Sequence, residues 1–148
     1  MNKMVLKFWL LLAFLGSAHL VTAQCTADQY VDKALQRLNG TPGFTFLKGY
    51  QLDGKGGDKP KIEFSYIFSK DTQYMITLAN KDTEIRGLIV NLYDANRQLV
   101  GTSYDEKSKK YYPGLGYRSK ATGIYYISFT FDGAKDFCAA GVLGFKRN

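Results

Sequence analysis

The segment from residue 104 to residue 120 alternates aromatic rings with cationic side chains and holds the clearest candidate site in the sequence. Tyrosine rings stack on sugars or bases, and lysine and arginine pair with phosphate, sulfate or uronate groups. The alternative is that some tyrosines pack inward with their hydroxyls at the rim, while the lysines are ordinary solvated charges. The candidate binding residues are Tyr104, Lys109, Lys110, Tyr111, Tyr112, Tyr117 and Arg118.

The first 23 residues have the pattern of a secretory leader. Lys3 and Lys7 precede an apolar run over residues 8–16, and Val21–Ala23 supplies the small residues that a signal peptidase requires. The run is too short for a membrane span, and no later stretch approaches the roughly 18 apolar residues that a spanning helix needs. We therefore expect an exported protein, periplasmic or extracellular, with no transmembrane segment.

Removal of the leader also removes His19, the only histidine of the chain. Without imidazole, Ser-His-Asp and Cys-His catalytic sites and histidine-based zinc sites are excluded. A glycoside hydrolase needs only two carboxylates, but most acids lie in expected turns, where Asp accepts local backbone hydrogen bonds. A turn such as that of Asp94 and Asn96 offers oxygen ligands to calcium, yet no EF-hand spacing is present. We expect a protein that is not an enzyme, with no cofactor and no metal.

The two cysteines, Cys25 and Cys138, are expected to form a disulfide because they are an even pair in an oxidising compartment. A redox or metal-binding pair would show a closer spacing. The formal charge of +7 becomes +5 after cleavage, since the leader carries two lysines and no acids. This balance favours contact with anionic polymers or a membrane surface, and it also keeps an exported protein soluble.

A short amphipathic helix is expected over Ala27–Leu38. Thr26 and Gln29 have the form of a capping box, and apolar residues then recur at the spacing of one helical face. Gly40, in a left-handed conformation, and Pro42 are expected to end the helix.

After the helix, the apolar period changes from 3.6 to 2, which indicates strands. The strand at 87–93 is nearly all apolar, as in a strand buried on both faces. We expect two hairpins, one from the strands at 61–69 and 73–80 and one from those at 87–93 and 98–103, and a mobile loop over 104–117. The expected strands are Phe44–Leu52, Lys61–Ser69, Gln73–Asn80, Gly87–Tyr93, Gln98–Ser103, Gly123–Phe131 and Gly141–Lys146.

About eight short strands with closely spaced turns and a single helix are typical of a sandwich rather than of alternating β-α units. We predict a mostly β fold, a jelly-roll-like β-sandwich of about eight strands with a short N-terminal helix. No repeat, low-complexity tract or linker marks a second domain. Residues 1–23 are therefore expected to be the signal peptide and residues 24–148 a single domain.

Three segments look like strand signatures of bacterial pre-peptidase C-terminal domains, which are small secreted β-sandwiches. They are Tyr74–Leu78, Ile89–Asn96 and Ala121–Ile127, and the resemblance extends over roughly Ile62–Phe145. It implies an accessory or binding module without catalysis, and it carries over no functional residue. The chain departs from this family in its N-terminal helix, its cysteine pair and the lack of an attached catalytic domain. It is also similar to small secreted proteins of Bacteroidetes-type bacteria, whose leaders end in Ala-Gln.

These observations together predict a noncatalytic binding or accessory module. Its expected partner is a cell-surface or extracellular glycan or an envelope protein, whereas the compartment disfavours nucleic acid. One alternative is a structural or assembly component of the bacterial envelope whose exposed strand edge pairs with another chain. A carboxylate-only glycoside hydrolase is a further alternative.

Overall fold

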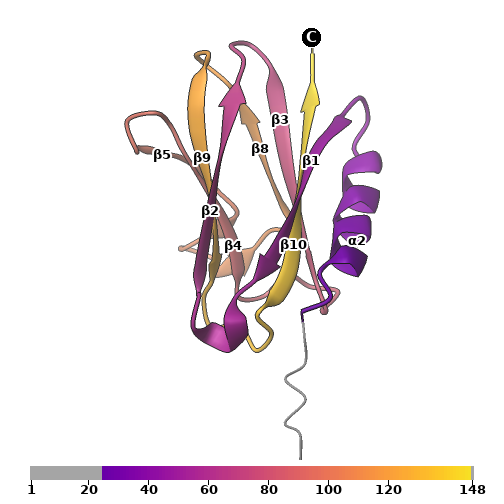
Figure 1. Cartoon of the computed structure of the whole chain (residues 1–148). Coiled ribbons are helices and arrows are strands. Elements are labelled where there is room, and N and C mark those ends of the chain that lie inside the picture. Colours follow the sequence, from indigo (N-terminus) through magenta and orange to yellow (C-terminus); the bar gives the residue numbers. More distant parts are fainter. Residues whose placement is uncertain (1–24, 148) are drawn as a thin grey trace, which may run out of the picture.

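Two four-stranded antiparallel sheets pack face to face in the computed structural model, which describes residues 25–147 (Figure 1). The expected leader, residues 1–23, lies outside the described residues. The single helix within 25–147 that is longer than one turn is α2 (Asp28–Asn39), and η1 (Lys55–Gly57) is a short 3-10 turn. The strands are β1 (Thr45–Asp53), β2 (Lys61–Phe68), β3 (Gln73–Asn80), β4 (Leu88–Tyr93), β5 (Leu99–Thr102), β6 (Tyr104–Asp105), β7 (Lys110–Tyr111), β8 (Gly114–Arg118), β9 (Gly123–Phe131) and β10 (Cys138–Lys146).

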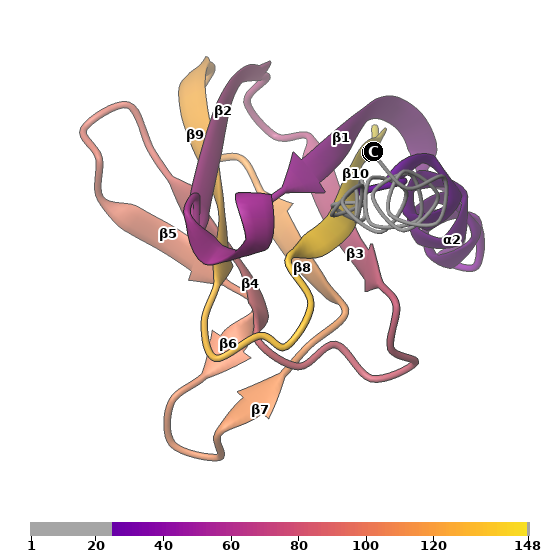
Figure 2. The same cartoon turned by 60° about the horizontal axis from the view of Figure 1, so that its bottom comes forward.

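The strand order is β1-β10-β3-β8 in one sheet and β2-β9-β4-β5 in the other. The prediction of a mostly β sandwich with a short N-terminal helix is confirmed, and the eight strands of the two sheets match the expected number. The remaining two strands, β6 and β7, form a separate hairpin that projects beyond the sheets (Figure 2). The segment 104–117, expected as a loop, therefore contains this hairpin and most of strand β8.

The expected hairpin between the second and third strands is wrong. The strand β2 pairs with β9, whereas β3 pairs with β10 and β8 in the opposite sheet. The chain crosses between the sheets at residues 69–72, where the Ser69 backbone N–H donates to the Tyr74 hydroxyl at 2.8 Å. Because both strands turn an apolar face to the same core, Phe68 and Tyr74 stack across it with ring centroids 3.7 Å apart. The second expected hairpin, β4 with β5, is confirmed.

The core between the sheets is aromatic and aliphatic. Phe68 stacks on Tyr125 as well as on Tyr74, and a second aromatic group joins Tyr50, Phe64 and Phe129. The apolar strand β4 lies between β9 and β5 and is largely buried, as its composition predicts. Burial of these side chains supplies the main favourable free energy of the fold.

Helix α2 covers the outer face of the first sheet, over β1, β10 and β3 (Figure 1). Ala34 and Leu38 are fully buried against Ala79 and Val142, and the Thr77 hydroxyl donates to the Ala34 carbonyl at 2.8 Å. The residues that cap α2 differ from the expected ones. Ala27 is the N-cap, with the Gln29 amide bonded to the Thr26 hydroxyl, and Gly40 is right-handed with φ −70°.

The expected disulfide between Cys25 and Cys138 is present. It joins Cys25, three residues before α2, to the first residue of β10, a central strand of the sheet on which the helix lies. None of the helices within the described residues is long and apolar enough to cross a membrane.

Candidate binding groove

The hairpin β6–β7 carries four of the seven candidate residues, and a fifth, Tyr112, follows it directly. The Asp105 carboxylate shapes its turn, because it accepts the Ser108 hydroxyl at 2.7 Å and the Lys107 backbone N–H at 3.0 Å. These hydrogen bonds, that of Ser108 foremost, lower the pKa of the Asp105 carboxyl. Lys109 completes the turn in a left-handed conformation with φ +55°. The acid therefore has a local structural role.

The tyrosines of the hairpin divide into a paired set and an exposed one. Tyr104 and Tyr111 lie opposite each other in register, with ring centroids 4.7 Å apart. Both are half-buried, and burial is the main cause that raises the pKa of Tyr111. Tyr112 is 40% exposed, and the Lys110 ammonium lies 5.0 Å from its ring centroid. Tyr112 and Lys110 thus present an aromatic face and a charge side by side.

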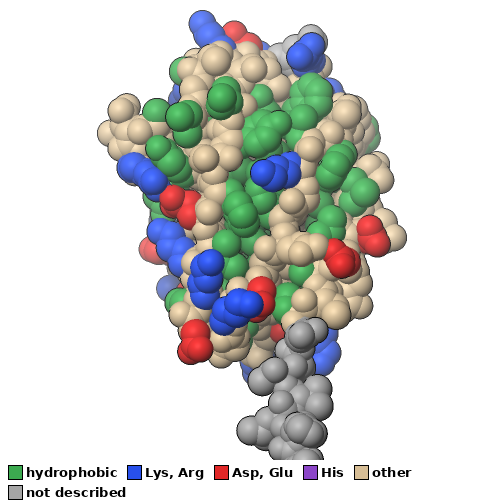
Figure 3. All heavy atoms as spheres, in the orientation of Figure 1, with side chains coloured by type: hydrophobic (Ala, Val, Ile, Leu, Met, Phe, Trp, Pro, Cys, Tyr) green, Lys and Arg blue, Asp and Glu red, His purple; other side chains and the backbone are tan. Residues whose placement is uncertain are grey.

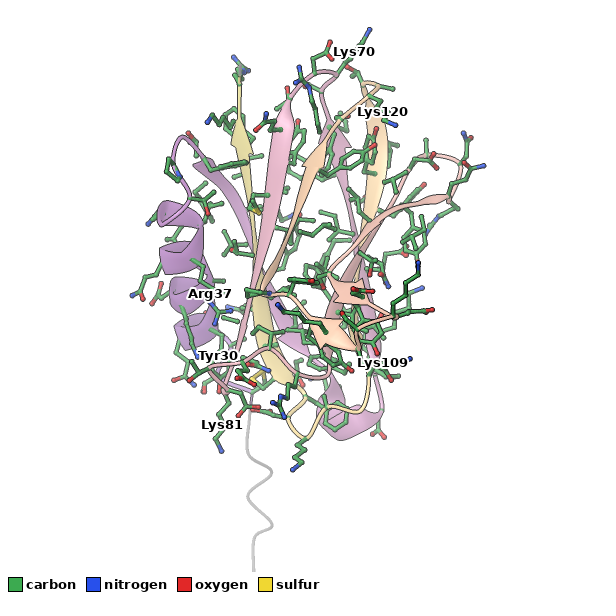
Figure 4. All side chains as sticks on the ribbon, turned by 180° about the vertical axis from the view of Figure 1, so that it is seen from behind. Tyr30, Arg37, Lys70, Lys81, Lys109 and Lys120 are labelled. Carbon is green, nitrogen blue, oxygen red and sulfur yellow. A yellow bond between two sulfur atoms is a disulfide. The ribbon has the colours of Figure 1, made fainter. Side chains whose placement is uncertain are left out.

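Tyr117 and Arg118 do not join this hairpin. Strand β8 carries them away from it, so that Tyr117 lies opposite Tyr74 and packs on Tyr125 at 5.7 Å between ring centroids. Burial, followed by a hydrogen bond with Tyr125, raises the pKa of Tyr117 to about 12. Figure 4 shows Lys120, two residues beyond Arg118, near the opposite end of the molecule from Lys109. The inward-packing alternative thus describes Tyr117.

Backbone hydrogen bonds fix the base of the hairpin to both sheets. The Tyr112 N–H donates to the Ser103 carbonyl at 2.8 Å, and the Leu78 N–H donates to the Pro113 carbonyl at 2.8 Å. The buried Ser103 hydroxyl in turn accepts the Val90 N–H at 2.9 Å. The hairpin therefore projects from a rigid support.

Beside the hairpin lies a groove of about 640 Å³, here called the basic groove, which three separate segments line. Four of its side chains are cationic, and one, Glu84, is a carboxylate. The Glu84 carboxylate accepts hydrogen bonds from Arg86 at 2.8 and 3.1 Å, so it already has a partner. The lining residues are Arg37, Thr83, Glu84, Ile85, Arg86, Lys109, Lys110, Tyr111 and Pro113.

Arg37, in the last turn of α2, is the best-positioned cation of the basic groove. Its guanidinium donates to the Leu78 carbonyl and, at 3.2 Å, to the Thr83 carbonyl. Burial lowers the pKa of Arg37 from its ordinary value, yet an arginine remains charged in proteins. Among residues 25–147 its hydrogen-bond partners are neutral carbonyls, so its charge is not neutralised by a carboxylate. Figure 4 places Arg37 beside α2 on the face that also carries Lys109.

The loop between β3 and β4, which brings Arg86 to the groove, is held by the helix and by a close backbone approach. Lys33 donates to the carbonyls of Asn80 and Asp82, both at 3.1 Å. Gly87 then turns the chain with φ +71°, at a point where a Cβ would lie 2.6 Å from the Ala134 Cα. The loop is therefore fixed from both sides.

The sequence interpretation found the two lysines and the tyrosine of the groove and missed both arginines. Arg37 lies on the polar side of an amphipathic helix, and Arg86 follows Glu84 in a polar turn. In the sequence, both arginines look like ordinary surface charges. A basic residue in the last turn of a helix was the available signal for Arg37.

Among the described residues, no group of three or more Cys, Asp or Glu side chains could hold a metal ion.

No family model matches the chain, and no curated protein matches it. Among solved structures, the chain is similar to PliG of Aeromonas hydrophila, a periplasmic lysozyme inhibitor of g-type lysozyme. The identity is 10%, the match covers 70% of this chain and 87% of the other, and the TM-score is 0.46. A likeness this distant carries no argument about function.

Proposed function

We propose that the protein is an exported, noncatalytic binding module that recognises anionic groups in the basic groove. The charge of the groove carries this proposal. Four cations against one carboxylate give a formal net charge of +3, and that carboxylate is already paired with Arg86. Anions are attracted to such a concentration of unneutralised charge, and guanidinium groups bind carboxylate, sulfate or phosphate through two parallel hydrogen bonds.

The remaining lining fits a ligand with an apolar as well as a charged part. Ile85 is buried at the floor, with 3% exposure, and Tyr111 and Pro113 supply further apolar surface. Tyr112 does not line the groove, but its exposed ring lies next to Lys110 and is available for stacking on a sugar or another flat group. The proposed ligand class is thus an acidic polymer of the envelope or exterior, with sulfate, phosphate or carboxylate groups.

Two observations support export and the lack of catalysis. The disulfide Cys25–Cys138 is typical of proteins that fold in an oxidising compartment. The groove holds positive charge, and its one carboxylate, Glu84, is engaged by Arg86 rather than placed to act as a general base. We therefore place the module in the periplasm or outside the cell.

Retention on immobilised heparin, a sulfated and uronate-containing polysaccharide, tests the proposal. The variant Lys109→Ala with Lys110→Ala is compared with Lys70→Ala plus Lys120→Ala, which removes the same charge from the opposite end of the molecule (Figure 4). We expect the groove variant to elute at clearly lower salt than the control variant, and Arg37→Gln to elute earlier than wild type. Equal elution of the two double variants would show that retention follows net charge alone and would refute the groove as the site.

A parallel column of immobilised polyglutamate distinguishes the sources of the anionic group. Preference for heparin over polyglutamate at equal salt indicates an acidic glycan, and the reverse preference indicates an acidic protein segment. Either preference is assigned to the basic groove only if the Lys109→Ala plus Lys110→Ala variant loses it.

A further inference from the structure

The four edges of the two sheets differ in how well they are protected against pairing with another strand. The edge strand β5 has four residues next to a register shift, and β8 has five residues. The edge strand β1 carries a bulge between Phe46 and Lys48. By contrast, β2 pairs with β9 without interruption from Lys61 to Phe68, and β9 is its single strand partner among the described residues. Long, regular edges without bulges or proline are the ones that accept an added strand.

The sandwich is also open on the side where β1 and β2 lie. On the opposite side the sheets meet closely, because a Cβ on Gly101 of β5 would lie 3.1 Å from the Leu115 side chain of β8. Between β1 and β2 the Tyr50 ring contacts that of Phe64, at 4.7 Å between centroids. Figure 3 shows hydrophobic side chains gathering along this open side, between the two sheets. We call this side the open edge and define it by Leu47, Lys48, Tyr50, Phe64 and Tyr66.

Three side chains of the open edge are incompletely covered, whereas Tyr50 is buried. Leu47, Phe64 and Tyr66 pack against the core but remain half-buried, and Phe46 beside them is 47% exposed. On the outer face of β2, Ile67 is 64% exposed and lies opposite Ile124, which is 47% exposed. A hollow of about 480 Å³ lies here, lined by Ser65, Tyr66, Ile67 and Ile124. Apolar surface therefore borders β2 along its inner face and, on its outer face, at the Ile67 end alone, since the other outward side chains are Lys61, Glu63 and Ser65.

Lys48 gives the open edge its charge. It lies on the same face of β1 as Tyr50, with its ammonium 5.5 Å from the Tyr50 ring centroid. Among the described residues the ammonium forms no salt bridge. The Tyr50 hydroxyl beneath it is buried and has no hydrogen-bond partner. Lys48 thus has no carboxylate partner, and the side chains around it are apolar. A ligand that is apolar and carries an acidic group would complement both features.

We propose that β2 accepts an extended segment of a partner protein as an added strand, apolar on its inward face and carrying an acidic side chain within reach of Lys48. In this mode the backbone hydrogen bonds supply affinity, and alternate side chains supply specificity. A second copy of this chain fits less well. The inward-facing side chains of its β2 are Ile62, Phe64, Tyr66 and Phe68, so self-pairing would leave Lys48 without an acid and bring a second Lys48 to the same edge. This inference does not depend on the basic groove.

Two blocked octapeptides of alternating valine and threonine, one with a central glutamate and the other with a central lysine, test the proposal. Each is titrated into isotope-labelled protein spanning residues 24–148 while amide NMR shifts are recorded. We expect shifts along β2, slower amide exchange at alternate β2 residues, and about fivefold tighter binding of the glutamate peptide, the ratio for a partly exposed ion pair.

Charge reversal at the open edge supplies the decisive comparison. In Lys48→Glu the preference should invert toward the lysine peptide, whereas Lys135→Glu, an equal charge change at an exposed site outside this edge, should keep the wild-type preference. Equal binding of both peptides to wild type, no binding at millimolar peptide, or shifts confined to the basic groove would each overturn the proposal. The proposal would also be overturned if the protein alone sedimented as a dimer and the variant Ile67→Lys dissociated it, because a second copy would then occupy the edge.

Discussion

Cys25 and Cys138 lie 113 residues apart in the sequence, and the disulfide between them brings their Cα atoms to 5.3 Å. The bond fastens the start of α2 to the first residue of β10, the strand that pairs with both β1 and β3. The helix that presents Arg37 to the basic groove is thus tied covalently to the sheet beneath it. Its far end is held by packing of Ala34 and Leu38.

The first prediction concerns this bond. The variant Cys25→Ser with Cys138→Ser should lower the free energy of unfolding by up to about 4 to 5 kcal/mol, because the unfolded chain regains the entropy of a long open loop. The folded state should keep α2, since its apolar face remains buried. Denaturant unfolding of oxidised wild type and of the variant, followed by circular dichroism, measures the difference. Superimposable unfolding curves would contradict it.

Individual strands follow from the sequence where β-branched and aromatic residues fill a segment that turn residues border. The bounds expected for β3 and β9 coincide with the observed ones, and both segments have this composition. Strand β8 was missed since Gly114 and Gly116 interrupt its pattern. A Cβ on Gly114 would lie 3.0 Å from the Ile76 carbonyl oxygen, so the position that looks like a turn is one of close strand approach.

Strand pairing is less accessible to the sequence than strand location. The polar residues 70–72 separate β2 from β3 by a turn-sized gap, which fits a hairpin and a crossing between sheets equally well. The crossing prevails because it places Phe68 and Tyr74 on opposite walls of one core. That outcome depends on β9 and β10, which lie more than 40 residues further along the chain.

The residues of the basic groove also differ in how far the sequence alone predicts that they lie together. The hairpin residues Lys109, Lys110 and Tyr111 are neighbours in sequence and remain neighbours in space. Arg37 and Arg86 reach the groove only through the packing of α2 on the sheet and the fixed path of the loop between β3 and β4. Local pattern predicts the first group, and tertiary structure alone supplies the second.

The second prediction concerns Gly87, which shapes that loop. A side chain at this position meets both a left-handed backbone, with φ +71°, and the Ala134 backbone at 2.6 Å. Gly56 has a similar φ of +64° but open space around it, so Gly56→Ala measures the conformational cost alone, about 1 kcal/mol. Gly87→Ala should be more destabilising than Gly56→Ala by at least about 1 to 2 kcal/mol, as in other overpacked sites. Equal losses in thermal or denaturant unfolding would show that the loop relaxes away from Ala134.

The third prediction uses the buried hydroxyl of Tyr50, which is 1% exposed and has no hydrogen-bond partner. Burial, with a smaller effect of the nearby Tyr66, raises the pKa of Tyr50 to about 12. A phenol has a pKa of about 10 in an unfolded chain, so the neutral form is favoured by folding. Its contribution to stability is fully present below pH 10 and is lost as the pH rises from 10 toward 12.

Tyr50→Phe removes this titration while keeping the ring contacts with Phe64 and Phe129. At pH 7 the variant should be as stable as wild type or slightly more stable, because it deletes a buried hydroxyl that lacks a partner. Between pH 9 and pH 11 the stability of wild type should fall more steeply, toward a total difference of about 2 to 3 kcal/mol above pH 12. Lysines and other tyrosines titrate in both chains and cancel in the difference. Parallel stability curves over this range would show that Tyr50 ionises in the folded protein as readily as in the unfolded one, and hence that its hydroxyl reaches water.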